Sequence, residues 1–548
     1  MPAAITPASP VVTAAPSPPV LARRGELLGL LLLLALVSLY RLLLLGHNGL
    51  DLYLDEAQYW TWAQHLQWGY FSKPPVIAGL IAATTAVCGD GGVCVKSGAV
   101  LLYPLITLLI YALAKRLFNR PEEAAVAPWS AVTFFTLPGA ALSAMIISTD
   151  VPLFLFWTAA LYCYVRALEQ DQWRWWLAAG LAAGLGLLTK YTMVIFALSV
   201  LLHLATSPAL RPQLRKPQLY VTMLIAAIVF APNLWWNAQH GWPTLRHTEQ
   251  ISHLQSDAGL HWNHLFEFLG GQFAITGPVL LLAFVIQLLA LRAVWIADAR
   301  LRLLACFALP FLGVISLQAL LGRANANWGA MTYAAATIFA VALLLRRQQK
   351  KWLVVGLVFN VALTLVAYHY DGLARMFGVE LSAKTDLYKR VRGWSELGRQ
   401  ASVLQSQYPQ ALLMGDSRDV LAELEYYIQP HPLDAVLWNP TRTMDSHYAL
   451  ATTLDDKLGR DFVYVTGRST LDEYVVASFD SVEALPPLHV AIHPNYALAY
   501  HVWLLQHFNG YRSGAALISA PTLAPTAAAT SAPESEAPTP APTRAPAP

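Results

Sequence analysis

The residues with the clearest chemical potential begin in one short stretch, LDEAQYWTWAQHLQWGYFSKPP, at positions 54–75. It places an acidic pair, Asp55 and Glu56, ahead of an aromatic-rich run that includes Tyr59, and it ends with Lys73 before two prolines. A lysine held by a stiff turn at a membrane surface contacts either a lipid headgroup or a bound phosphate. The acidic pair fits the N-terminus of a helix, where the helix dipole favours carboxylates. The residue types alone leave a structural and a functional interpretation open.

Two further charged residues lie within apolar sequence. Asp150 stands in ISTDVP, between two apolar runs, and Lys190 stands in GLGLLTKYT. A proline two residues after Asp150 suits the first turn of a helix, so Thr149 or Asp150 is expected to be its N-cap. A charge amid apolar residues is costly in a membrane and often functional, which favours a role for Lys190. The glycines before it are not a phosphate-binding loop, because G-x-x-x-x-G-K-[ST] is absent.

The composition indicates a membrane protein. Of 548 residues, 56% are hydrophobic and 13% are charged, and the mean hydropathy is +0.45, whereas a soluble domain carries about 25% charged residues. The net charge of +3 gives no support for a nucleic-acid partner. The four cysteines form no C-x-x-C pair, which argues against a zinc site. Cys88 and Cys94 enclose GDGGV, and both a disulfide in an oxidising compartment and two free thiols fit this spacing.

Apolar runs long enough to cross about 30 Å of hydrocarbon recur as far as residue 369, and they predict about 11 to 13 membrane spans. The first follows Arg23-Arg24 and is too long for the core of a signal peptide, so we expect it to be a retained transmembrane helix. The runs are 27–45, 97–116, 126–147, 151–168, 173–189, 191–206, 218–236, 270–291, 301–321, 327–345 and 351–369.

Basic residues assign a side of the membrane to each loop. With Arg23-Arg24 inside, every later basic cluster also falls in the cytoplasm, as the positive-inside rule requires. This agreement holds only if the short segment 74–87 does not cross, so we expect it to be re-entrant or to lie in the interface. The acidic stretch, both charged residues in apolar sequence and everything after residue 370 then face outside. An amphipathic helix that begins at Glu56 is expected to lie on the outer leaflet. Its apolar face would carry Tyr59, Trp62, Ala63 and Leu66, and its polar face Gln58, Thr61, Gln64 and His65.

The composition also divides the chain into four parts. Residues 1–24 and 516–548 are rich in Pro, Ala and Thr and are expected to be disordered. Residues 25–370 form the transmembrane part. Residues 371–515 alternate strand-like runs (ALLMGD, DFVYVTG, LHVAIHP) with helical ones (DVLAELEYYI, LDEYVVASF), which predicts a small extracytoplasmic α/β domain. The expected fold is a polytopic α-helical membrane protein, with interfacial helices in its first external loop and this domain at its C-terminal end.

Taken in order, the acidic pair, GYFSKPP, TDVPLFLFW, GLGLLTKYT and ANWGAMTY resemble the GT-C class of membrane glycosyltransferases. The likeness is to bacterial relatives of protein O-mannosyltransferases and of lipid A aminoarabinose transferases. It covers about residues 25–370 and continues more loosely through GDSRDVLAELEYYI. Such enzymes move a sugar from a polyprenyl-phosphate carrier to a lipid, glycan or protein acceptor. The resemblance implies that this transfer takes place on the external face of a bacterial inner membrane.

The resemblance also implies a role for each residue. Asp55 would be the general base that deprotonates the acceptor as it attacks the anomeric carbon with inversion. Lys73 would bind the leaving phosphate of the donor. The other candidates would bind substrate: Asp150, Lys190, Glu56 and Tyr59. No cofactor is implied, and the need for a divalent metal stays open, because a D-x-D motif is absent and lysine can supply the positive charge.

Two other classes of function compete with the enzyme. A transporter or flippase of a lipid-linked sugar binds its substrate near the bilayer midplane and often has inverted repeats. Here the polar residues gather at one face and no repeat is visible, which favours the enzyme. A membrane-anchored scaffold that displays the α/β domain would not need an aspartate and a lysine in the first loop.

Overall fold

The structure, a computed structural model, describes residues 20–252 and 259–512. These residues divide into two compact units. Unit 1 contains the chain as far as Gly49 and the long segment Trp62–Leu373, and it is helical. Unit 2 contains the short segment Leu50–Thr61 and the chain from Ala374 onward. Of the residues that are expected to be disordered, 1–19 and 516–548 lie outside the described residues, whereas 20–24 form the start of the helix α1 (Val20–His47), contrary to that expectation.

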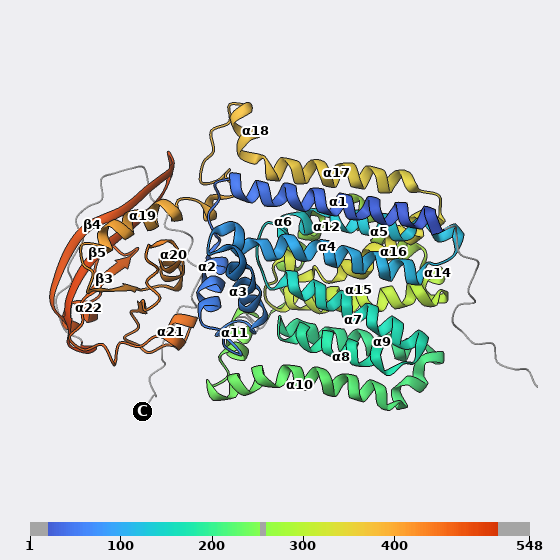
Figure 1. The fold of residues 1–548 in the computed structure, drawn as a ribbon, viewed down its shortest axis with the longest axis horizontal. Helices are drawn as coiled ribbons and strands as arrows, with labels where there is room; N and C mark the ends of the chain where they lie inside the picture. The colour runs from blue at the N-terminus through green and yellow to red at the C-terminus, as the bar shows by residue number, and fades with distance from the viewer. Residues whose placement is uncertain (1–19, 253–258, 513–548) are drawn as a thin grey trace, which may run out of the picture. The chain divides into compact units, whose positions relative to one another are not determined.

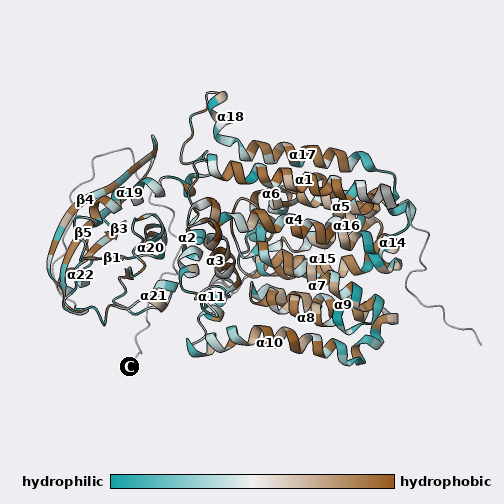
Figure 2. Cartoon of the chain, in the orientation of Figure 1, coloured by the Kyte–Doolittle hydropathy of each residue, from teal (hydrophilic) through white to brown (hydrophobic). Residues whose placement is uncertain are grey.

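Unit 1 is a bundle of long apolar helices that run side by side (Figure 1). Within the described residues, six helices are long and apolar enough to cross a membrane, or seven if the bent pair α12 and α13 is one span. Hydrophobic residues cover most of their length and polar residues gather toward their ends (Figure 2). The six are α1 (Val20–His47, apolar from Gly25), α4 (Gly92–Leu117), α7 (Asp150–Gln170), α10 (Pro217–Gln239), α15 (Ala299–Leu321) and α17 (Lys350–Tyr368).

The remaining expected spans lie on shorter or broken helices. The run 126–147 is split into two helices before Pro138, and the run 270–291 crosses a bend of 117° at Gly277. Both breaks have a local cause, because proline cannot continue a helix and Gly277 has a φ of +74°. The helices concerned are α5 (Val126–Phe135), α6 (Pro138–Ser143), α8 (Trp173–Leu187), α9 (Val194–Thr206), α12 (Trp262–Thr276), α13 (Pro278–Ala290) and α16 (Thr332–Arg346).

Short elements complete the connections. Two of them, α2 and α3, follow the first long helix, and the others join later helices. They are α2 (Leu54–Gln64), α3 (Val76–Cys88), η1 (Pro121–Glu123), η2 (Tyr191–Met193), η3 (Pro208–Arg215), α11 (Pro243–Ser252), α14 (Arg292–Ala297), η4 (Ala326–Gly329), α18 (Tyr370–Met376) and η5 (Lys389–Val391).

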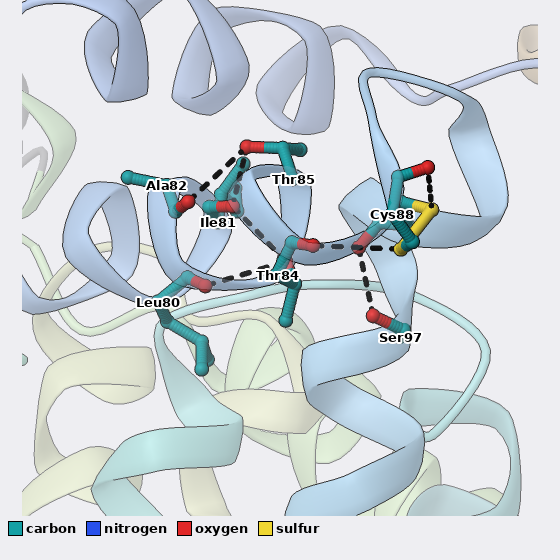
Figure 3. The surroundings of a disulfide bond; sticks show 8 residues. Leu80, Ile81, Ala82, Thr84, Thr85, Cys88 and Ser97 are labelled. Atoms are coloured by element: carbon teal, nitrogen blue, oxygen red, sulfur yellow. Dashed lines mark hydrogen bonds between the residues drawn. A yellow bond between two sulfur atoms is a disulfide. The ribbon is translucent and has the colours of Figure 1, made fainter.

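The segment that was expected not to cross the membrane forms α3. Its 13 residues make a helix of about 20 Å, which is shorter than the ~30 Å of a hydrocarbon core. The helix lies across one end of the bundle (Figure 1). A disulfide between Cys88 and Cys94 ties its last residue to the first turn of α4 (Figure 3). Of the two alternatives for these cysteines, the structure therefore has the bonded one.

Unit 2 is an α/β domain built on one five-stranded sheet of order β2-β1-β3-β5-β4. The strands β2, β1 and β3 are parallel, and the long β4–β5 hairpin joins them antiparallel through β5. The strands are β1 (Leu412–Gly415), β2 (Val436–Leu437), β3 (Phe462–Thr466), β4 (Phe479–His493) and β5 (Tyr496–Phe508). The helices are α19 (Trp394–Gln405), α20 (Arg418–Tyr427), α21 (His447–Ala451) and α22 (Glu473–Ser478).

The apolar runs of the sequence become the core of this unit. Strands β1 and β3 coincide with ALLMGD and DFVYVTG, because both runs are buried, and α20 coincides with DVLAELEYYI. LHVAIHP is only the second half of β4, a 15-residue edge strand. Its first half was not expected, since Pro486 and Pro487 interrupt the pattern there. The structure accommodates the two prolines in a register shift between Leu485 and Leu488, which suits an edge strand because proline cannot donate to a ladder.

A buried carboxyl group joins α2 to α20 within unit 2. Glu425 is almost fully buried, and its Oε2 accepts hydrogen bonds from Thr61 Oγ1 at 3.0 Å and from Tyr448 Oη at 2.8 Å. Burial raises the pKa of Glu425 to about 8, although both hydroxyl groups oppose this shift. The side chain is therefore protonated in the folded protein at neutral pH.

We expect the contribution of Glu425 to the free energy of unfolding to fall as the pH rises from about 4.5 to about 8. Over this range the folded state keeps the Glu425 proton and the unfolded chain has released it, so this contribution drops by about 1.4 kcal/mol per pH unit and is then constant. Glu425→Gln should remove this slope. Thermal unfolding of the purified protein between pH 5 and pH 9 measures it. The control is Glu483→Gln, at an exposed position of β4; an equal slope in the Glu425 variant would contradict the assignment.

Candidate active site

The acidic pair lies in the first turn of α2, and the two carboxylates have different environments. Glu56 is buried and its Oε2 accepts the backbone N–H of Tyr53 at 2.8 Å, so it closes the start of the helix. Asp55 is 43% exposed, and its Oδ1 accepts a hydrogen bond from Arg418 Nη2 at 2.7 Å. Tyr59, one turn later, is buried. Of the three candidates on this helix, Asp55 alone combines a charge with substantial exposure.

Helix α2 differs from the amphipathic helix that was expected. Gln58, on the expected polar face, is 2% exposed, and Trp60 is 1% exposed. Leu66, on the expected apolar face, lies beyond the end of the helix and is 61% exposed. The helix is thus buried around most of its surface. The cause is protein packing, which a pattern of apolar residues does not distinguish from burial against lipid.

Residues 50–61 are fastened to the rest of unit 2 along their whole length. Asp51 Oδ2 accepts the backbone N–H of Trp394 at 2.8 Å, and the N–H of Leu52 donates to Tyr427 Oη at 2.6 Å. Further along, the ring of Trp60 meets Tyr426 edge-on with centroids 5.0 Å apart. Together with the contacts of Asp55 and Thr61, these interactions fix the acidic turn to α19 and α20. No local pattern could indicate these contacts, because the partners are more than 340 residues apart in the chain.

In unit 1, the GYFSKPP loop is held by α10, α11 and the end of α8. Asn233 Nδ2 donates to the carbonyl of Trp68 at 2.7 Å, and Thr244 Oγ1 donates to the carbonyl of Tyr70 at 2.9 Å. Gly69 between them packs so closely against Trp236 that a Cβ would lie 2.4 Å from its ring. This loop therefore has a single position against α10.

Lys73 lies at the end of that loop and is half-buried. Its carbonyl accepts the N–H of Tyr70 at 3.0 Å, which closes a tight turn. After the two prolines, the N–H of Val76 donates to the carbonyl of Leu188 at 3.1 Å. The turn that carries Lys73 is thus joined to the segment that carries Lys190.

The structure brings Asp150 and Lys190 together as a buried ion pair. Lys190 Nζ lies 2.6 Å from Asp150 Oδ1, and the two side chains are 19% and 12% exposed. Asn327 Nδ2 donates to the other carboxylate oxygen, Oδ2, at 2.8 Å. Thr149 is the N-cap residue of α7 without a capping side-chain bond, so the carboxylate of Asp150 serves the ion pair and not the helix end. Three motifs of the sequence therefore meet at one point.

Asn327 is the residue of this cluster that sequence reasoning did not single out. It belongs to η4, in the ANWGAMTY motif, whose position depends on a buried glutamine of α12. Gln272 Nε2 donates to the carbonyl of Ala326 at 3.1 Å, and Gln272 Oε1 accepts from Tyr333 Oη at 2.9 Å. The ANWGAMTY motif marked this segment as part of the family resemblance. It did not identify the partner of Asn327, because an asparagine in a loop follows no periodic pattern.

In the part of the chain that the structure describes, Arg418 pairs with Asp55 and Lys190 pairs with Asp150. Within residues 20–252 and 259–512, no group of three or more His, Cys, Asp and Glu side chains is placed to hold a metal ion. Two histidines that follow α10 pack on aromatic rings: the ring centroid of His247 lies 5.2 Å from that of Phe71, and that of His240 lies 4.2 Å from that of Trp236.

Comparison with known proteins identifies relatives that match most of the chain or a part of it. The model of the dolichyl-phosphate-mannose-protein mannosyltransferase family matches residues 72–236. Lipid A galacturonosyltransferase RgtD of Rhizobium johnstonii is 34% identical over 426 residues, which cover 77% of this chain and 86% of that protein. An undecaprenyl phosphate-alpha-4-amino-4-deoxy-L-arabinose arabinosyl transferase of Pseudomonas fluorescens is 30% identical over 38% of this chain and 40% of its own.

Solved structures share the fold. The crystal structure of ArnT from Cupriavidus metallidurans bound to undecaprenyl phosphate matches with a TM-score of 0.59 and 16% sequence identity. The match covers 87% of this chain and 98% of ArnT. Its fold agrees with the expected bundle of membrane helices followed by a C-terminal α/β domain. With a relative at 34% identity across most of both chains, this protein belongs to the GT-C family of multi-pass membrane glycosyltransferases.

Proposed function

We propose that this enzyme transfers a hexuronic acid of the galacturonosyl type from a polyprenyl-phosphate donor to lipid A. The observation that carries the proposal is the similarity to lipid A galacturonosyltransferase over 77% of the chain. The aminoarabinose transferases, whose sugar is a pentose, align over 38% of it. The pentosyl donor is therefore the second candidate, and transport of the lipid-linked sugar is the alternative from a different class.

The carboxylate of Asp55 is suited to act as the general base. In the described part of the chain, Oδ1 is occupied by Arg418 and Oδ2 has no hydrogen-bond partner. A free carboxylate oxygen can accept the proton of an acceptor hydroxyl while that oxygen attacks the anomeric carbon. The bond between the sugar and the donor phosphate breaks with inversion, and polyprenyl phosphate leaves. Lys73 would stabilise the negative charge that develops on it.

The Asp150–Lys190–Asn327 cluster is suited to position the donor. The cluster lies in unit 1. The segment that contains Lys190 is joined to the Lys73 turn by the hydrogen bond from the N–H of Val76 to the carbonyl of Leu188. Lys190 is 19% exposed, so its ammonium group keeps access to a ligand while Asp150 holds it in place. In this proposal both lysines supply positive charge and no divalent metal is needed.

We propose that transfer takes place on the external face of the inner membrane. A disulfide forms in an oxidising compartment, and Cys88–Cys94 lies in the turn between α3 and α4, which begins 15 residues after Lys73 and is separated from it by the short helix α3. The basic clusters KRLFNR and RRQQKK, at 115–120 and 346–351, lie at the opposite ends of α4 and α16 from the turns of Cys94 and Asn327. Both observations support the same orientation.

The first experiment compares the lipid A of cells that lack the gene, that express it, and that express Asp55→Asn. Mass spectrometry should find a hexuronic acid on lipid A only with the active protein. In vitro, Asp55→Asn should lower kcat by about 10²–10⁴-fold, because a general base typically contributes that much. An added aminopentose would select the second candidate. Undiminished modification by Asp55→Asn would contradict the assignment of the base, and unchanged lipid A in all strains would favour transport.

A cysteine at position 73 tests both the side of the membrane and the phosphate site. In a variant with Cys163 and Cys306 replaced by alanine, Lys73→Cys should react with a membrane-impermeant thiol reagent added to intact cells. In proteoliposomes, polyprenyl phosphate should slow this reaction, and transfer by Lys73→Cys should be lost. Transfer by the unaltered protein should persist in EDTA.

Two controls make the result at position 73 decisive. The denatured Lys73→Cys protein must react fully with the reagent, which shows that its thiol is present and reduced. Labelling of the native protein only from the cytoplasmic side would overturn the orientation, and labelling that polyprenyl phosphate leaves unchanged would overturn the phosphate site.

The buried pair gives a prediction that separates stability from function. Asp150→Asn leaves Lys190 charged without a counter-ion, so it should lower the free energy of unfolding by about 3–5 kcal/mol. Adding Lys190→Met removes the second charge and should restore most of the stability but no transfer. Thermal unfolding and the transfer assay measure the two effects.

The surface ion pair of Asp171 and Lys216 provides the matched control. Its atoms are also 2.6 Å apart, but the side chains are 50% and 32% exposed, so Asp171→Asn should cost less than about 1 kcal/mol. Wild-type transfer by the Asp150→Asn, Lys190→Met protein would mean that the buried pair is structural alone.

A further inference from the structure

In unit 2, Arg418 forms a hydrogen bond with Asp55, the carboxylate that is proposed to be the general base. Arg418 is the first residue of α20, after the N-cap residue Ser417. Its Nη2 lies 2.7 Å from Asp55 Oδ1, and its Nε lies 3.4 Å from Asp419 Oδ1. Both Arg418 and residues 50–61 belong to unit 2, so this contact lies within one compact unit.

The charge of Arg418 is permanent under physiological conditions. Burial lowers its pKa, but the carboxylates of Asp55 and Asp419 outweigh burial and raise the pKa above its ordinary value. A guanidinium that cannot release its proton is a fixed donor. Its hydrogen bond to one oxygen of Asp55 sets the direction in which the other oxygen points.

We propose that Arg418 is a positioning residue of the transferase: it orients Asp55 so that Oδ2 receives the proton of the acceptor. This inference rests on the proposed function. It assigns to the α/β domain a part in the reaction itself. Arg418 does not touch donor or acceptor in this role, and no bond to it forms or breaks.

The surrounding contacts make a purely structural role for Arg418 a weaker explanation. The acidic turn is already fixed to unit 2 by Asp51 on the Trp394 N–H, by Leu52 on Tyr427 and by Thr61 on Glu425. The Arg418–Asp55 pair is itself partly exposed, at 30% and 43%. Such pairs contribute only about 0–1 kcal/mol to stability. Its specific effect is therefore on the orientation of a single carboxylate.

The test is a double-mutant cycle on kcat, measured with purified protein, polyprenyl-phosphate sugar and lipid A. Arg418→Gln should lower kcat by about 10- to 100-fold, the cost of a misplaced catalytic group, and should leave the KM for the donor unchanged. Arg418→Lys should recover part of the loss, because it keeps a charged donor. In an Asp55→Asn background, Arg418→Gln should change kcat by less than about twofold, since interacting residues are non-additive.

The control is Arg442→Gln, which removes an arginine from a similar pair in the same unit. Arg442 Nη2 lies 2.8 Å from Asp455 Oδ1, with both side chains more than half exposed, and kcat should not change. Equal thermal midpoints for the Arg418 and Arg442 variants establish that both fold. If Arg418→Gln does not fold, the cycle uses Arg418→Lys.

The outcomes distinguish the two proposals. An equal loss from Arg418→Gln with and without Asp55 would overturn the positioning role and leave the function intact. A wild-type rate for Asp55→Asn alone would overturn the general base and, with it, the inference about Arg418.

Discussion

The buried ion pair of Asp150 and Lys190 is the constraint on which unit 1 depends. A charge placed alone among apolar helices costs several kcal/mol, so neither residue is tolerable there without the other. The distance of 2.6 Å between them and the bond from Asn327 to the second carboxylate oxygen satisfy both oxygens of Asp150. The start of α7, the end of α8 and the η4 turn must therefore meet. This polar contact therefore helps to fix how α7, α8 and η4 lie against one another.

In the loop that carries Lys73, polar groups are also paired, but here the groups are neutral. Its backbone carbonyls would be unsatisfied where water is scarce, and the side chains of Asn233 and Thr244 supply the missing donors. Tyr191, next to Lys190, donates to Asn233 Oδ1 at 2.7 Å. The lysine that is proposed to bind phosphate and the buried pair thus share one hydrogen-bonded framework. Preorganisation of this kind lets charges act in a transition state without rearrangement.

The sequence predicted the parts of the fold that hydropathy alone determines. A long apolar run in lipid must form a helix, because no other local structure satisfies its backbone, and the long helices coincide with expected spans. The breaks at Pro138 and Gly277 were visible as residue types, but the apolar pattern continues across them. In the α/β domain, β1, β3 and α20 followed from short buried runs, whereas β5 and the first half of β4 did not.

The candidate site was predictable only residue by residue. Asp150 and Lys190 were singled out because a charge in apolar sequence is energetically costly. The structure pairs the two charges with each other. Asn327 and Arg418 are polar residues in loops or at helix ends, where such residues are ordinary. Their partners lie 177 and 363 positions away in the chain. A single sequence, taken by itself, carries no sign of a pairing at that range.

The position of Asp55 within unit 2 changes how the α/β domain should be understood. The carboxylate precedes Lys73 by only 18 residues in the chain, yet its hydrogen bond comes from Arg418 at the start of α20, so the proposed mechanism gives the α/β domain a part in transfer. The similarity to lipid A galacturonosyltransferase covers 77% of the chain, whereas unit 1 makes up about two thirds of it. That similarity therefore extends into unit 2. The proposed role of Arg418 in orienting Asp55 gives this unit a reason to have stayed similar to that relative.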